Sequence, residues 1–295
     1  MPEYPHYSLD GVALNDPADR WFLDGGAFQV PPLPGARAVD VAVPGVHGVL
    51  PVAGLDLEST VLGGQLIITD TTPGGVSGGP RQLQDNLASV YALLGGRERM
   101  LDLRYHLDEA TVRQADALMI ASTTPDLLTT TTARLALLLQ VPGALWRDTD
   151  TSTWGPATLA TLAAAAEVDT LTGSTGPITD AIIRIRGTAS QPSVTDTGTG
   201  GTVTYTGSLT SGQRLLLDCA RMRAARVSTD TWDLSAGTDV TGAIAATGPR
   251  SGSRWLHLAP QIIGADPAIR QIRITAAAAS QTGATVEIRA RRAYL

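Results

Sequence analysis

The sequence predicts a mainly β protein with two domains, one amphipathic helix in the first and a β-sandwich or jelly roll in the second. Three observations predict this. The chain has 295 residues, which is more than one typical core needs. Apolar and polar residues alternate with a period of two along much of the chain, most clearly after residue 177. Only residues 80–96 place several apolar side chains at the spacing of one helical face.

The first domain is expected to span residues 1–155. Turn signals break residues 1–70 into short strands, and "GGQLIITD" (63–70) is one of them. The helix follows, with Pro80 at its first position and a left-handed cap at Gly95 or Gly96. Strand-like segments then run from 99 to 141. The apolar face of the helix is formed by Leu83, Leu87, Val90, Tyr91 and Leu94.

The second domain is expected to span residues 156–295. Its strands include "IIRIRG" and "TVTYTG", and the latter belongs to a Gly- and Thr-rich stretch, 192–219. That stretch reads as a hairpin or meander, with Val, Tyr and Leu inside and Thr outside. The polar segment "WRDTDTSTWGP" (146–156) marks the junction between the domains. Residues 157–171 fit either a helix or a linker strand with a short helix, and both alternatives stay open.

Composition excludes several classes of protein. Hydrophobic residues make up 43% and charged residues 17% of the chain, a globular composition. The net charge is −6, which argues against a nucleic-acid-binding surface. All 22 basic residues are arginine, so a Walker-type phosphate loop and Schiff-base chemistry are unavailable. The single cysteine, Cys219, excludes an internal disulfide, and the apolar run 135–146 is too short to span a bilayer.

One motif suggests catalysis. "GVSGG" (75–79) matches the G-x-S-x-G nucleophile elbow at Ser77, but six residues separate it from the preceding strand, whereas the elbow is a tight turn. A hydrolase would also need Ser77 beside His106 or His257. The four histidines lie apart in the sequence, so a zinc site is unsupported. We therefore predict no catalytic residues, no metal and no cofactor.

An ordered series of residues in the second half carries a resemblance. It lies in "STGPITDAIIRIRGTASQPSVTDTGTGGTVTYTGSLTSGQRLLLDC" and ends in "VEIRARRAYL". In the first half, "VAVPGVHGVLP" (41–51) and "GPRQLQDNLASVYALL" fit more loosely. Together they resemble the distal tail protein (Dit) family of siphophages, in particular actinobacterial phages. The landmark residues of the predicted sandwich are Pro177, Asp180, Pro192, Asp196, Tyr205 and Asp218.

The resemblance implies both a fold and a function. The fold is an N-terminal split-barrel domain with one α-helix and a C-terminal galectin-like β-sandwich. The function is a hexameric ring at the virion tail tip, assembled in the host cytoplasm, that joins the tail tube to the hub and baseplate proteins and lets DNA pass. The implied partners are other copies of the chain, the major tail tube protein, the tail-associated hub protein and the tape measure protein, without sequence-specific nucleic acid binding or membrane insertion.

Within that hypothesis, the first domain is expected to supply the ring and hub contacts, through residues 44–54 and 55–70. The specific candidates are Pro44, Gly45, His47, Gly48 and Leu55. An alternative is a carbohydrate- or receptor-binding tail module that uses the sandwich, which exposed and clustered tryptophans would favour. The sugar-binding signature of galectins, H-x-N-x-R followed by W-x-x-E-x-R, is missing from the sequence, so we expect no galectin-type lectin activity.

Overall fold

The computed structural model describes residues 5–25, 30–37, 41–42, 49–50, 56–95, 98–121, 124–249 and 255–295. The chain divides into two compact units, an N-terminal unit of Met1–Thr149 with Leu295 and a C-terminal unit of Asp150–Tyr294. The division falls inside the polar segment 146–156. Residues 152–158 form a strand, β14 (Ser152–Thr158), which pairs with a strand of the C-terminal unit. The first residues of this strand therefore belong with the sandwich.

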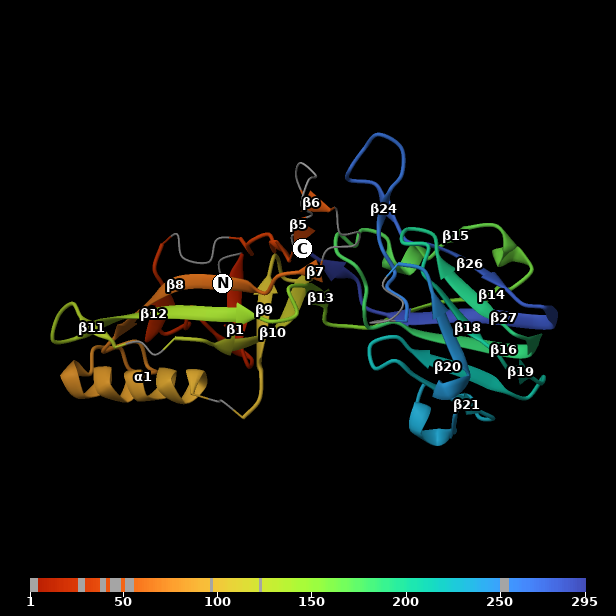
Figure 1. Cartoon of the computed structure of the whole chain (residues 1–295). Coiled ribbons are helices and arrows are strands. Elements are labelled where there is room, and N and C mark those ends of the chain that lie inside the picture. The colour runs from red at the N-terminus through yellow and green to blue at the C-terminus, as the bar shows by residue number, and fades with distance from the viewer. Residues whose placement is uncertain are drawn as a thin grey trace. The chain divides into compact units, whose positions relative to one another are not determined.

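The N-terminal unit is built on one curled antiparallel sheet (Figure 1). Its strand order is β2-β1-β9-β10-β12-β8-β3; β11 also pairs with β12, and β13 with β10. Two short ribbons, β4–β7 and β5–β6, accompany it. The strands are β1 (His6–Leu9), β2 (Val12–Ala13), β3 (Trp21–Leu23), β4 (Ala36–Arg37), β5 (Val41–Ala42), β6 (Val49–Leu50), β7 (Asp56–Leu57), β8 (Thr60–Thr69), β9 (Leu101–His106), β10 (Val112–Met119), β11 (Asp126–Leu127), β12 (Thr132–Val141) and β13 (Trp146–Asp148).

The predicted helix is α1 (Gly79–Leu94), which lies along this sheet (Figure 1). Four of the five predicted apolar side chains are buried, and Tyr91 remains 44% exposed. Pro80 is the second helical residue rather than the first, because Gly78 is the N-cap. Gly95 ends the helix with φ −79°, so the left-handed cap predicted there is wrong for Gly95. Its amide instead donates to the Tyr91 carbonyl, continuing the helical hydrogen-bond pattern.

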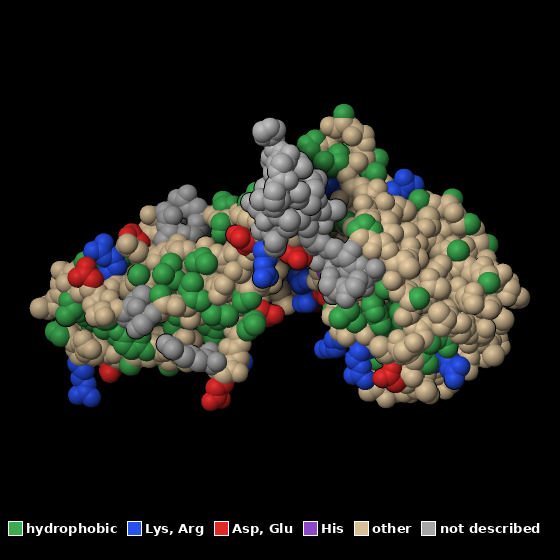
Figure 2. Space-filling view, in the orientation of Figure 1, with side chains coloured by type: hydrophobic (Ala, Val, Ile, Leu, Met, Phe, Trp, Pro, Cys, Tyr) green, Lys and Arg blue, Asp and Glu red, His purple; other side chains and the backbone are tan. Residues whose placement is uncertain are grey.

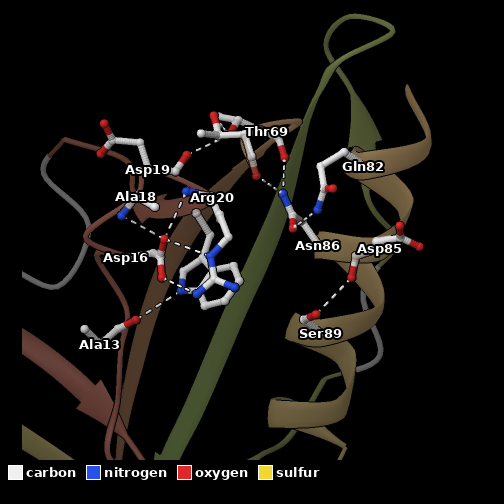
Figure 3. Close-up of polar contacts among 12 residues, drawn as sticks. Ala13, Asp16, Ala18, Asp19, Arg20, Thr69, Gln82, Asp85, Asn86 and Ser89 are labelled. Atoms are coloured by element: carbon white, nitrogen blue, oxygen red, sulfur yellow. Dashed lines mark hydrogen bonds and ion pairs between the residues drawn. The ribbon is translucent and has the colours of Figure 1, made fainter. Parts of the chain in front are cut away.

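Hydrogen bonds from two side chains, Trp21 and Asn86, hold the parts of the N-terminal unit together (Figure 3). The Trp21 indole on β3 donates to the Ala13 carbonyl on β2, which links the two ends of the sheet order at 3.0 Å. The buried Asn86 amide on α1 donates to the carbonyls of Thr69 and Thr71, each at 2.8 Å. These bonds satisfy backbone oxygens just where β8 ends, and they fix α1 against that end of the strand.

The C-terminal unit contains two main antiparallel sheets and one separate ribbon, β24–β25 (Figure 1). One sheet has the order β14-β27-β16-β20-β21-β22 with β19 on β16, and the other has the order β15-β26-β17-β18-β23. The strands are β15 (Ala166–Glu167), β16 (Ile182–Ser190), β17 (Ser193–Asp196), β18 (Thr202–Tyr205), β19 (Ser208–Leu209), β20 (Arg214–Asp218), β21 (Arg223–Val227), β22 (Thr238–Asp239), β23 (Ile244–Thr247), β24 (Gln261–Ile262), β25 (Arg270–Gln271), β26 (Arg273–Ala277), β27 (Ser280–Ala290) and β28 (Ala293–Tyr294).

The Gly- and Thr-rich stretch is packed structure. β17 and β18 pair antiparallel, and their apolar side chains Val194, Val203 and Tyr205 are buried while the intervening threonines are half-buried. The ambiguous residues 157–171 follow the second alternative. They complete β14 and then form two single-turn 3₁₀ helices, η1 (Thr161–Ala163) and η2 (Asp169–Leu171), on either side of β15.

Candidate functional site

The interface residues expected from the sequence lie outside the described part of the chain. This applies to Pro44, Gly45, His47, Gly48 and Leu55. What the structure does describe of the predicted 55–70 segment is β7 and β8. β8 pairs along its whole length with β12 on one side, but with β3 only at Leu66–Ile68 on the other. β8 is therefore the main described part of the candidate interface.

The G-x-S-x-G serine caps a loop. The Ser77 hydroxyl donates to Asp70 Oδ2 at 2.5 Å, and the Gly79 amide donates to the same oxygen at 2.9 Å. These two hydrogen bonds lower the pKa of Asp70 and keep it a carboxylate, which ties the end of β8 to the start of α1. His106 lies on β9 and bonds to Ser8, so the Ser77–His106 pair that a hydrolase would need is not formed.

Two histidines that are 100 residues apart in the sequence meet in the sheet. His6 and His106 are opposite each other on β1 and β9, with ring centroids 4.4 Å apart and planes within 5°. The Ser8 hydroxyl and His106 Nε2 are hydrogen-bonded at 2.9 Å. Burial lowers the pKa of His106, and His6 and Arg104 lower it further. Sequence spacing could not reveal this pair, because strand pairing brings the two residues together.

A buried arginine, Arg184, lies between the core residues Ile183 and Ile185 on β16. Its side chain is on the opposite face of the larger sandwich sheet. Arg184 is 7% exposed, although the alternation in "IIRIRG" places it opposite the core isoleucines. Its Nε donates to Glu287 Oε2 at 2.7 Å, and its Nη1 donates to Asp230 Oδ1 at 2.6 Å. The guanidinium carbon lies 4.2 Å from the centroid of the Trp232 ring. The segment after β21 thus covers a charge that sequence alternation alone would leave in solvent.

The landmark residue Asp196 is a buried hydrogen-bond acceptor. It is fully buried at the end of β17, and its Oδ2 accepts from both the backbone and the hydroxyl of Thr199 at 2.8 Å. The Ala259 amide donates to its other oxygen at 3.3 Å. Burial raises the pKa of Asp196, although these hydrogen bonds act in the opposite direction. The residue joins the β17–β18 turn to a distant segment, which is a structural role.

The other landmarks also anchor turns and chain crossings. Asp218 is buried and accepts from the Arg221 amide and guanidinium, while Asp180 accepts from Arg291 Nε at 3.0 Å. The Tyr205 amide donates to the Pro192 carbonyl at 2.9 Å. Pro177 directly precedes a backbone bridge between Ile178 and Leu258. The carboxylates of Asp180, Asp196 and Asp218 therefore all bond within the chain.

The sandwich tryptophans, the metal-ligating side chains and the helices bear on other functions. Trp154, Trp232 and Trp255 of the sandwich are each half-buried, so they do not form the exposed cluster that would favour the carbohydrate-binding alternative. In the described part of the chain, no three His, Cys, Asp or Glu side chains are grouped as metal ligands would be. Of the helices that the structure describes, none combines the length and apolar character that crossing a bilayer requires.

Comparison with known proteins gives a match by structure. No family model matches the chain, and no curated protein matches it by sequence. The crystal structure of the Dit protein of phage SPP1 aligns over 99% of this chain and 100% of its own, with a TM-score of 0.60 and 15% identity.

The chain has the Dit fold. The match includes both units, so the split barrel with its single helix and the sandwich are found in the order that the resemblance implied. The phage p2 baseplate in its activated conformation also aligns, over 97% of this chain and 98% of the other, at 10% identity. Its TM-score of 0.38 is too low to add to the argument.

Proposed function

We propose that this chain is a structural tail-tip hub protein of a long-tailed phage. The observation that carries the proposal is the end-to-end match to SPP1 Dit, which is described as a paradigm of the hub adsorption apparatus in phages that infect Gram-positive bacteria. The contacts of the landmark carboxylates and the hydrogen bond from Ser77 to Asp70 support a structural rather than a catalytic role.

In this proposal the N-terminal units form a ring of six copies that joins the tail tube protein to the tail-associated hub protein. The tape measure protein is a further partner of the ring, and DNA passes through the ring at the virion tail tip. Charge supports the proposal. The N-terminal unit holds 17 acidic residues and 9 arginines, net −8, while the C-terminal unit holds 11 and 13, net +2. An acidic ring would repel the DNA backbone and keep it from adhering during passage.

The mass of the purified full-length chain in solution tests the ring. One chain weighs 30.7 kDa, so six weigh about 184 kDa. We expect mass photometry across a range of concentrations to find a stable species at that mass, and negative-stain microscopy to show a ring with a central opening. A chain that stays monomeric both alone and when mixed with its tail tube protein would contradict the proposal.

A further inference from the structure

Two arginines stand side by side on the outer face of the larger sandwich sheet. Arg186 on β16 and Arg214 on β20 are directly opposite each other in the antiparallel register. Residues opposed in this way point to the same face, with their Cβ atoms about 4.5–5.5 Å apart. Because Ile185 is buried in the core, the next residue, Arg186, points to the outer face, and Arg214 points there with it. Two like charges at such positions repel each other.

Neither arginine has a carboxylate at hydrogen-bond distance among the described residues. Arg186 donates through Nε to the Thr285 hydroxyl at 3.0 Å, and Arg214 donates through Nη1 to the Ser228 carbonyl at 3.2 Å. Asp230 Oδ1 is 3.9 Å from Arg214 Nε, which is too far for a hydrogen bond, and this nitrogen has no hydrogen-bond partner. The repulsion between the two arginines is therefore only partly compensated within the chain.

The two carboxylates on this part of the face serve a third arginine. Glu287 Oε2 accepts from Arg184 Nε, and Asp230 Oδ1 accepts from Arg184 Nη1. Arg184, Arg186 and Arg214 thus bring three positive charges against two negative ones, which leaves an excess of one positive charge. Figure 2 shows arginine side chains at the surface of the C-terminal unit. A local excess of positive charge attracts anions from solution.

The arginine pair can be reached from solvent. The Arg214 side chain is 21% exposed, and Arg186 is half-buried. The residues of this unit that the structure does not describe, 250–254, follow Gly248 in the chain. Gly248 lies against Gly201, next to β18 of the other sheet. The described residues therefore leave both guanidinium groups accessible to a ligand.

The chemistry of the pair selects the class of ligand. A guanidinium donates two parallel N–H bonds to two oxygens of one acceptor. One guanidinium occupies both oxygens of a carboxylate, whereas the three terminal oxygens of a phosphate group serve two guanidinium groups at once. We propose that Arg186 and Arg214 form a binding site for a phosphate group, either free or carried on a larger molecule. This site goes beyond the ring of the proposed function and does not rest on it.

Calorimetric titration of the full-length chain with inorganic phosphate, at fixed ionic strength, tests the site. Arg186→Gln and Arg214→Gln each remove one guanidinium, and each should raise the Kd about tenfold or more. Arg289→Gln is the matched control, because it removes the same charge from the same face of the sheet on β27 and should change the Kd by less than about twofold. Acetate should bind the wild type far more weakly than phosphate does. A wild type that binds no phosphate, or glutamine variants that bind it as tightly as the wild type, would overturn the proposal.

A variant that gains affinity keeps the test valid if a glutamine variant folds poorly. Asp230→Asn removes the carboxylate that lies 3.9 Å from Arg214 Nε, so phosphate should bind more tightly, and unchanged or weaker binding would count against the site. Glycerol 3-phosphate distinguishes the two sources of the group: it should bind as tightly as inorganic phosphate if the site takes a phosphate carried on a larger molecule, and more weakly if the site takes the free ion. A hexamer that binds no phosphate would refute the site and keep the ring.

Discussion

At the scale of single residues, the stacked imidazoles of His6 and His106 couple the N-terminal unit to pH. The two rings lie parallel across the β1–β9 pair, and Arg104 on the same strand adds a positive charge near His106. Protonation of His106 is unfavourable here because it would place a cation in a partly buried site beside a second imidazole and an arginine. The folded chain therefore binds this proton less readily than the unfolded chain does.

This difference predicts a loss of stability in mild acid. The pKa of His106 is lowered from 6.5 in the folded state, so the unfolded chain binds more protons once the pH falls below about 6.5. The free energy of unfolding should decrease from there down to the lower, folded pKa. We expect Tm to fall more between pH 7.5 and pH 5 in the wild type than in His106→Gln, which has no titrating ring. Equal falls in the two proteins would show that this histidine does not contribute.

At the scale of elements, the pair β16–β27 contains a buried ion pair between strands. Arg184 and Glu287 are direct cross-strand neighbours, and both side chains are 8% exposed. Asp230 also bonds to Arg184 but is 63% exposed, so solvent screens that contact. The stability of this part of the sandwich thus depends on two charges that compensate each other away from water.

Removing one partner is expected to cost more than removing both. Arg184→Met leaves Glu287 buried without its cation and should lower the free energy of unfolding by about 3–5 kcal/mol. The double variant Arg184→Met/Glu287→Met should recover most of that loss, because two apolar side chains need no counter-charge. Arg289→Met, a half-buried control on the same strand, should change stability by only about 0.5 kcal/mol. Denaturant titration checks all three, and additive losses in the double variant would argue against coupling.

At the scale of the whole molecule, each unit has its own core. Leu66, Leu103 and Leu137 are buried in the N-terminal unit, and Ile183, Leu215 and Val286 are buried in the C-terminal unit. Two separate cores allow two separate unfolding transitions, because the cooperativity of unfolding follows the packing within a core.

Calorimetry with one variant in each unit tests this independence. Asn86→Ala leaves the carbonyls of Thr69 and Thr71 without their donor, and Asp196→Ala removes the acceptor for Thr199 and Ala259. Each should lower the stability of its own unit by about 1–3 kcal/mol. We expect the wild type to show two transitions and each variant to shift a different one. A single transition that both variants shift equally would show that the two units unfold together.

The sequence alone determined the mainly β class, the two-part organisation, the helix after residue 79 and the buried faces of strands such as β17 and β18. These follow from local periodicity, which physical chemistry imposes on any half-buried strand or helix. Capping details were less accessible: Gly95 could have adopted the left-handed conformation but does not. The landmark Asp196 could be recognised from the ordered series of residues, but its role as a buried acceptor could not.

Only the tertiary structure decided which distant residues meet. The His6–His106 stack and the packing of Arg184 against Trp232 both depend on strand order and register, which bring together residues about 50 to 100 positions apart. Periodicity reports which face a side chain occupies, but it does not report what covers that face. For this reason alternation left Arg184 in solvent, and a serine in a catalytic motif proved to cap a loop.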